Sequence, residues 1–147
     1  MKIKELSLTN FRRFEQLDLK LPDSNFIILI GENGCGKSSV LDAMGMCLAH
    51  VTGKLISPKG SHVIKSYLKS NDIENGKFGV NATLRIDAFS EFIDINISKE
   101  IDKKGTKYNI SIDDLFDKFK NELRANRVVK LPIIVYYRLN RTDLQRT

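Results

Sequence analysis

The sequence lacks the features of a membrane protein and of a disulfide-stabilised secreted protein. It has only two cysteines, Cys35 and Cys47, which are too few for a disulfide framework, and it has no tryptophan. None of its apolar runs approaches the roughly 20 residues that a membrane-spanning helix needs. The first five residues, MKIKE, contain no apolar signal core. These absences predict a cytoplasmic protein without a membrane partner.

The composition is that of one globular domain. The chain has 147 residues, of which 41% are hydrophobic and 29% charged. Residues 1–50 contain 6 Lys and Arg against 6 Asp and Glu, whereas residues 51–147 contain 18 against 12, so the net charge of +6 lies in the second part. This excess fits a surface that faces nucleic acid or another acidic partner. Charges spread over ordinary solvated faces would give the same numbers.

The first third of the chain is predicted to form strands around a basic turn. Apolar and polar residues alternate over 3–8 and over 14–21, which predicts two short strands joined by the turn Asn10–Arg13. The β-branched run Phe26–Ile30 then predicts a strand buried on both faces, as in a parallel sheet.

Helical spacing follows that run. Apolar residues recurring at three and four positions predict a helix from about Lys37 to about His50, with Gly53 as its stop. The rest of the chain predicts loops with one short helical turn over 53–79, a meander of strands over 80–86, 92–101 and 108–112, a helix over 113–127 and a second buried strand over 131–137.

The segment Gly31–Ser38 (GENGCGKS) carries the chemistry. It matches the phosphate-loop pattern G-x-x-x-x-G-K-[S/T], with an apolar run before it and an amphipathic helix after it. Glycines allow successive N–H groups to turn inward as an anion nest, and the helix N-terminus adds positive potential. Lys37 is expected to reach the β- and γ-phosphates of a nucleotide, and the Ser38 hydroxyl to ligate Mg²⁺.

The first fifty residues resemble the ATP-binding heads of the SMC and RecF chromosome and repair ATPases, which are ABC-type. The resemblance rests on Asn10-Phe11-Arg12 between two strands, and on the loop with Asn33 followed by Ser38-Ser39-x-Leu41-Asp42-Ala43. The later segment 131–141 (LPIIVYYRLNR) is similar to prokaryotic AAA-family defence ATPases of the Septu and retron-associated group, relatives of the overcoming-lysogenization-defect nucleases.

This resemblance implies an α/β fold of the P-loop NTPase class, with parallel core strands, and ATP with Mg²⁺ as cofactors. It implies that Arg12 approaches the nucleotide phosphates, with Arg13 the less favoured neighbour; in the alternative, Arg12 is a solvated turn residue. Lys37 acts in catalysis, Ser38 holds the metal and Ser39 lies near the α-phosphate. The β- and γ-phosphates are wrapped by Asn33, Gly34, Cys35, Gly36 and Lys37.

The resemblance also implies partners. A second ATPase head would pair with this one as a homodimer, and DNA together with a nuclease or another defence effector would act alongside it. The basic residues expected to face DNA lie on the meander: Lys99, Lys103, Lys104 and Lys107.

Two motifs of ABC-type hydrolysis are missing from the sequence. It contains no apolar run ending in Asp-Glu (the Walker B motif) and no Ser-Gly-Gly signature. We therefore expect residues 1–147 to be the first lobe of a head that hydrolyses ATP when full length. A non-hydrolysing nucleotide-binding module is an alternative. A small phosphotransferase is another, but two strands precede the loop here and residues 54–77 contain no arginine for a lid.

Overall fold

The described part of the chain forms a five-stranded antiparallel sheet with one long helix across it. The computed structural model describes residues 1–56, 69–73, 76–88, 91–103 and 105–111, and the single positions 117 and 121. The sheet has the order β2-β1-β3-β4-β5. Its strands are β1 (Lys2–Phe11), β2 (Phe14–Lys20), β3 (Gly79–Ala88), β4 (Glu91–Asp102) and β5 (Gly105–Ser111).

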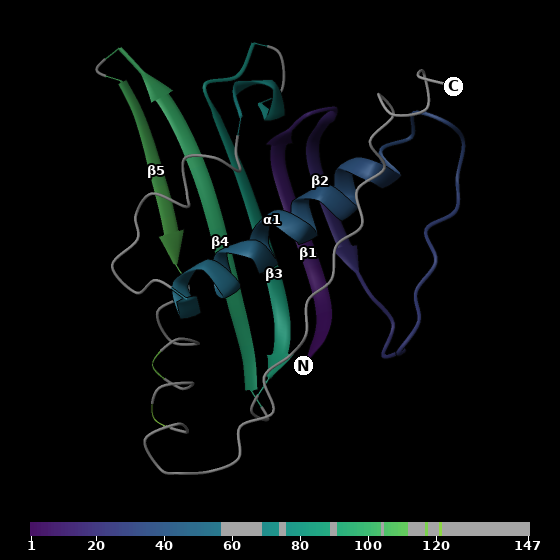
Figure 1. Cartoon of the computed structure of the whole chain (residues 1–147). Helices are drawn as coiled ribbons and strands as arrows, with labels where there is room; N and C mark the ends of the chain where they lie inside the picture. The colour runs from purple at the N-terminus through teal and green to yellow at the C-terminus, as the bar shows by residue number, and fades with distance from the viewer. Residues whose placement is uncertain are drawn as a thin grey trace, which may run out of the picture.

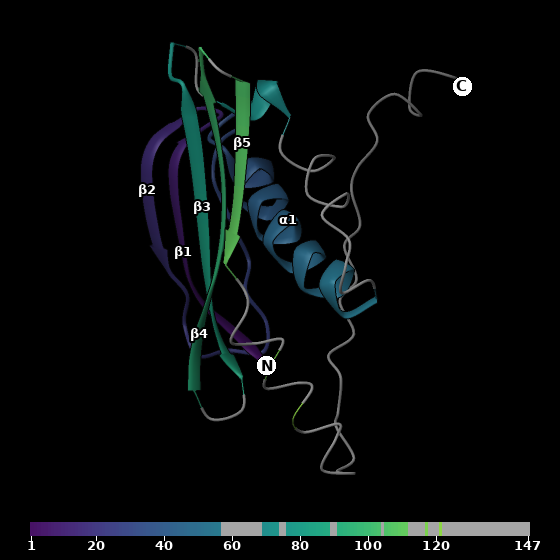
Figure 2. The ribbon, with the colours of Figure 1, turned by 90° about the vertical axis from the view of Figure 1, so that its left-hand side faces the viewer.

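The helix α1 (Lys37–Ile56) crosses the sheet diagonally and covers one of its faces (Figures 1 and 2). A short 3-10 turn, η2 (Ser70–Asp72), precedes β3. Within the described residues, no helix combines the length and the apolar character that crossing a bilayer requires.

The predicted hairpin and meander are confirmed. β1 pairs with β2 across the basic turn, with Leu6 opposite Leu19 and Phe11 opposite Phe14. β3, β4 and β5 form the meander, and β3 also pairs with β1, so the two strand groups join into one sheet. The helical turn expected within 53–79 is η2.

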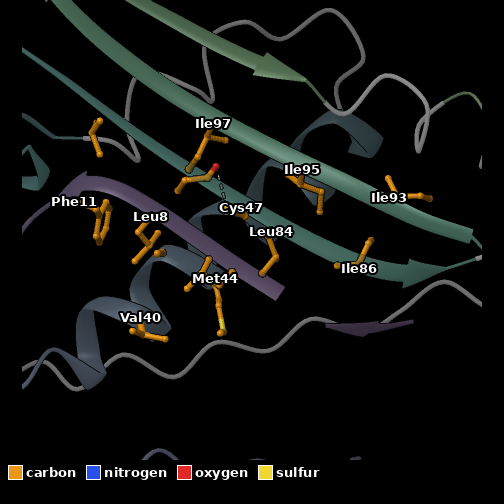
Figure 3. Packing of buried hydrophobic residues seen from close by; sticks show 14 residues of the cluster. Leu8, Phe11, Val40, Met44, Cys47, Leu84, Ile86, Ile93, Ile95 and Ile97 are labelled. Carbon is orange, nitrogen blue, oxygen red and sulfur yellow. Dashed lines mark hydrogen bonds between the residues drawn. The ribbon is translucent and has the colours of Figure 1, made fainter. Parts of the chain in front are cut away.

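The core lies between the sheet and α1 (Figure 3). Because side chains alternate along a strand, every second residue points towards the helix. The buried apolar strand residues are Leu6, Leu8, Phe11, Val80, Ala82, Leu84, Ile86, Ile93, Ile95 and Ile97. The helix contributes Val40, Ala43, Met44 and Cys47, which share one helical face. Burial raises the pKa of the Cys47 thiol to about 12, so Cys47 is a packing residue, as its spacing predicted.

The opposite face of the sheet is polar. Arg85 on β3 pairs with Glu5 of β1 at 3.0 Å and with Asp94 of β4 at 2.8 Å. The Asn96 amide donates to Asn81 and to Thr83 across the same face. Such alternation of a buried and a solvated face is typical of antiparallel sheets.

The prediction that Gly53 ends the helix is wrong. Helix α1 continues through it to Ile56. A glycine inside a helix costs about 1 kcal/mol relative to alanine, which does not by itself end a helix. Glycine favours a helix stop only where the chain needs a left-handed residue.

The prediction of parallel core strands is not met in the described residues. The run Phe26–Ile30 is irregular, and Figure 1 shows the segment between β2 and α1 running outside the sheet. Phe26 is 77% exposed and Ile30 89% exposed, although Leu29 packs against the core. An apolar run becomes a parallel strand only when other strands pair with it, and no described strand does so. The predicted helix over 113–127, apart from positions 117 and 121, and the strand over 131–137 lie outside the described residues.

The buried histidine of α1 makes stability depend on pH. Nδ1 of His50 donates to the Met46 carbonyl at 2.7 Å. Burial lowers the pKa of His50 below its ordinary value of 6.5, and the hydrogen bond to Met46 opposes this shift only in part. Below pH 6.5, His50 binds a proton more readily in the unfolded chain than in the folded chain. The free energy of unfolding should therefore fall as the pH drops through this range.

Thermal unfolding measured from about pH 7.5 to about pH 5.5, on either side of the ordinary histidine pKa, tests this expectation. The melting temperature of the wild-type protein should fall across that range, and a His50→Leu variant should show a weaker dependence. An equal dependence in both proteins would contradict the role assigned to His50.

Candidate functional site

The loop Gly31–Ser38 connects the irregular segment after β2 to the first turn of α1. Gly34 and Gly36 have φ values of +83° and +103°, in the left-handed region that favours glycine. The Cys35 N–H donates to the Glu32 carbonyl at 3.3 Å, which closes a tight turn. The loop is exposed to solvent over most of its length. It therefore presents bent backbone at the surface, directly before a helix.

The Lys37 side chain folds back over this loop. Its Nζ donates to the carbonyls of Gly31 at 2.8 Å and Glu32 at 2.7 Å, and lies 3.6 Å from the Cys35 sulfur. These partners are neutral, so the ammonium charge stays available to an anion. Phosphate oxygens offer stronger, charge-assisted bonds than carbonyls do.

The first turn of α1 supplies further donors. The first helical hydrogen bond runs from the Val40 N–H to the Gly36 carbonyl at 3.0 Å. The N–H groups of Lys37, Ser38 and Ser39 come before it and have no acceptor within the helix. Ser38 is exposed and Ser39 is half-buried. Donors of this kind, together with the helix dipole, favour a bound phosphate.

Two of the three loop glycines, Gly31 and Gly36, lie close to other side chains. A Cβ at Gly31 would lie 2.9 Å from the Cys35 sulfur. A Cβ at Gly36 would lie 2.9 Å from Cε2 of the Phe14 ring, and closer still to its Cζ. A side chain at Gly36 would therefore require the Phe14 ring or the loop to shift, whereas at Gly31 only the Cys35 side chain would have to move. Ser38 would give Mg²⁺ one oxygen ligand, with the remaining ligands from phosphate and water.

Arg12 lies between two carboxylates, one from α1 and one from η2. Its Nη1 donates to Asp42 of α1 at 2.6 Å, and its Nε to Asp72 of η2 at 2.8 Å. The Arg12 N–H also donates to the Asp72 carbonyl oxygen at 2.8 Å. Burial works to lower the pKa of Arg12, but the hydrogen bonds to Asp42 and Asp72 outweigh it and raise that pKa above its ordinary value. The alternative of a solvated turn residue is wrong, because these bonds tie three elements together.

Arg13 is the arginine that lies beside the loop. A Cβ at Gly36 would lie 3.2 Å from the Arg13 Cδ, and one at Gly34 would lie 3.9 Å from its Nη1. The structure thus places Arg13 next to the loop glycines, whereas Arg12 is engaged by Asp42 and Asp72. The predicted phosphate contact of Arg12 stays a prediction.

The basic cluster expected to face DNA is not one surface. Lys99 is buried, with its ammonium 5.6 Å from the centroid of the Tyr108 ring on the neighbouring strand. The two-residue period that points Ile93, Ile95 and Ile97 towards the helix reaches Lys99 as well, which is the reason the prediction is wrong for this residue. Lys103 is exposed and Lys107 pairs with Asp102 at 3.6 Å. Lys104 lies outside the described residues.

Sequence reasoning missed the roles of Asp72 and Phe14. Asp72 lies 60 positions from Arg12, and no local pattern connects them. The Leu41-Asp42-Ala43 motif includes Asp42, but the motif does not indicate that Arg12 is the partner of Asp42. Phe14 reads as an ordinary strand residue, and its contact with Gly36 depends on how the hairpin meets the helix.

Comparisons with known proteins agree with the loop chemistry. A family model described as an AAA domain matches residues 5–147. The chain is 27% identical over 146 residues to the retron Ec83 probable ATPase of Escherichia coli, an alignment that covers 97% of this chain and 27% of that protein. It is 37% identical over 109 residues to the DNA replication and repair protein RecF of Rickettsia akari, covering 74% of this chain and 28% of RecF.

A chromosome partition protein, Smc of Koribacter versatilis, matches at 36% identity over 64 residues, which is 43% of this chain and 5% of Smc. The predicted resemblance to retron-associated, RecF and SMC ATPases is thereby confirmed. The chain spans about a quarter of the length of the retron and RecF relatives, at 27% and 28%.

Proposed function

Because the chain belongs to the AAA domain family, we propose that it binds Mg-ATP through the loop Gly31–Ser38 as the nucleotide-binding part of an ATPase. The observation that carries this proposal is the position of Lys37. Its ammonium lies over a glycine loop at a helix N-terminus, and its partners among the described residues are backbone carbonyls and a sulfur. Relatives of this chain are probable ATPases, which supports a triphosphate as the ligand.

The chain's residues would make the following contacts with the nucleotide. Lys37 exchanges the carbonyls of Gly31 and Glu32 for oxygens of the β- and γ-phosphates. The backbone N–H groups from Asn33 onward surround the same phosphates, and Ser39 lies towards the α-phosphate. Ser38 turns its hydroxyl to the metal. When bound, Mg²⁺ neutralises charge that develops on the phosphates during their transfer.

Hydrolysis is proposed for the whole protein. The sequence has no Asp-Glu motif and no Ser-Gly-Gly signature, and the chain spans about a quarter of its retron relative, at 27%. We therefore expect a second lobe to supply the acid that activates water, and a second head to complete the site on dimerisation. RecF and Smc act in DNA repair and chromosome partition by name, which supports DNA as the object of the proposed ATPase.

Replacing Lys37 with alanine tests nucleotide binding. The variant should bind Mg-ATP roughly 10- to 100-fold more weakly, because one charge-assisted contact is worth about 1.5–3 kcal/mol. Isothermal titration calorimetry would measure the change. The melting temperature should stay near that of the wild type, since the Lys37 bonds are exposed.

Lys20→Ala is the matched control, because Lys20 is an exposed lysine at the end of β2. It should bind Mg-ATP as the wild type does. Equal binding by the Lys37 variant and this control would refute the proposed function. Binding without turnover by the whole protein would support the non-hydrolysing module.

A further inference from the structure

Two adjacent arginines at the β1–β2 turn have different environments, because one is paired with carboxylates and the other is exposed beside the phosphate loop. Arg12 donates to the Asp42 and Asp72 carboxylates, whereas Arg13 is exposed and lies along the loop glycines. Asn10 and Arg12 have φ values of 52° and 53°, so the backbone turns sharply between the two side chains. The bond from the Arg12 N–H to the Asp72 carbonyl holds this conformation.

Arg13 lies beside the loop without any ion pair to give up among the described residues. Its Nη1 would lie 3.9 Å from a Cβ at Gly34, so the guanidinium lies against the backbone that forms the anion nest. For Arg12 to reach the same place, it would have to break two hydrogen bonds, of 2.6 and 2.8 Å, and leave two buried carboxylates without that cation. Desolvated carboxylates that lose their cation are strongly unfavourable.

Two cations, Arg13 and Lys37, lie at the loop, which itself contains one acidic residue, Glu32. Among the ion pairs of the described residues, none involves Arg13 or Lys37. Two cations thus lie on the glycine loop with no carboxylate paired to either in that part of the chain. A planar guanidinium matches a phosphate group through two parallel hydrogen bonds, which an ammonium cannot form.

We propose that Arg13, rather than Arg12, supplies the guanidinium that contacts the β- or γ-phosphate of the bound nucleotide. In this assignment Arg12 is a positioning residue, which holds the turn so that Arg13 lies against Gly34 and Gly36. The inference rests on the proposed function, since it names a further residue of the same nucleotide site.

The test compares Mg-ATP, Mg-ADP and AMP binding to the wild type and to Arg13→Ala by titration calorimetry. The variant should bind Mg-ATP about 10-fold more weakly or worse, as expected for a lost charge-assisted contact, and should bind AMP as the wild type does. Arg13→Lys should bind Mg-ATP more tightly than Arg13→Ala but more weakly than the wild type. Lysine keeps the positive charge but cannot form two parallel hydrogen bonds to one phosphate. The melting temperature of Arg13→Ala should not change, because the side chain is exposed.

Arg85→Ala is the matched control, because it removes one arginine from the far face of the sheet. It should bind all three nucleotides as the wild type does. Wild-type affinity for Mg-ATP in Arg13→Ala would overturn the assignment while leaving the proposed function in place. Failure of the wild type itself to bind Mg-ATP would overturn both.

Discussion

Replacing Arg12 with alanine should lower the free energy of unfolding by about 3 kcal/mol, because the change leaves two desolvated carboxylates without their cation. The side chains of Asp42 and Asp72 are only 10% and 7% exposed. The same substitution releases η2 from the β1–β2 turn and from α1. Urea unfolding followed by circular dichroism would measure the loss.

The sheet offers a matched control in Arg85. This residue also pairs with two carboxylates, Glu5 and Asp94, but it is 43% exposed on the open face. Exposed ion pairs contribute about 0–1 kcal/mol, so Arg85→Ala should cost far less than Arg12→Ala. Equal destabilisation by the two substitutions would show that burial of the carboxylates is not the cause.

Replacing Gly36 with alanine should weaken Mg-ATP binding by about 100-fold or more, a difference of about 2.7 kcal/mol. The new Cβ would meet the Phe14 ring at 2.9 Å or less and the Arg13 Cδ at 3.2 Å. The loop must then shift, and its N–H groups leave the arrangement that surrounds a phosphate. Calorimetric titration with Mg-ATP measures the loss.

Gly76→Ala is a control for placing alanine at a left-handed glycine outside the phosphate loop. Gly76 has a φ of +82°, and no atom lies within 4 Å of a Cβ built there, so it shares the left-handed backbone without the contact. Its alanine variant should keep wild-type affinity for Mg-ATP. A double variant, Phe14→Ala with Gly36→Ala, should regain part of the lost affinity because the ring is gone. If Gly36→Ala bound Mg-ATP as well as Gly76→Ala does, the contact with Phe14 would have no part in the loop's shape.

Much of the fold could be predicted because its elements are encoded locally. Strict alternation over Val80–Ile86 and along β4 predicted strands, since a half-buried antiparallel sheet imposes a two-residue period. The glycine spacing of Gly31–Ser38 predicted the phosphate loop, since its backbone conformation requires glycine at fixed positions. The strand predicted for Phe26–Ile30 was wrong in the described residues, because pairing is not a property of the run itself.

Local patterns were thus sufficient for the hairpin, the meander and the helix after the loop, while phosphate binding by Lys37 and Ser38 stays a prediction. The partners of charged side chains depended on the assembled fold. Arg12 and Arg13 are adjacent and chemically identical in sequence, and the approach of Asp42 and Asp72 from α1 and η2 gives them different environments. The attraction between two opposite charges is stronger where both are removed from water. Whether these charges are removed from water depends on contacts between segments 30 and 60 positions apart in the sequence.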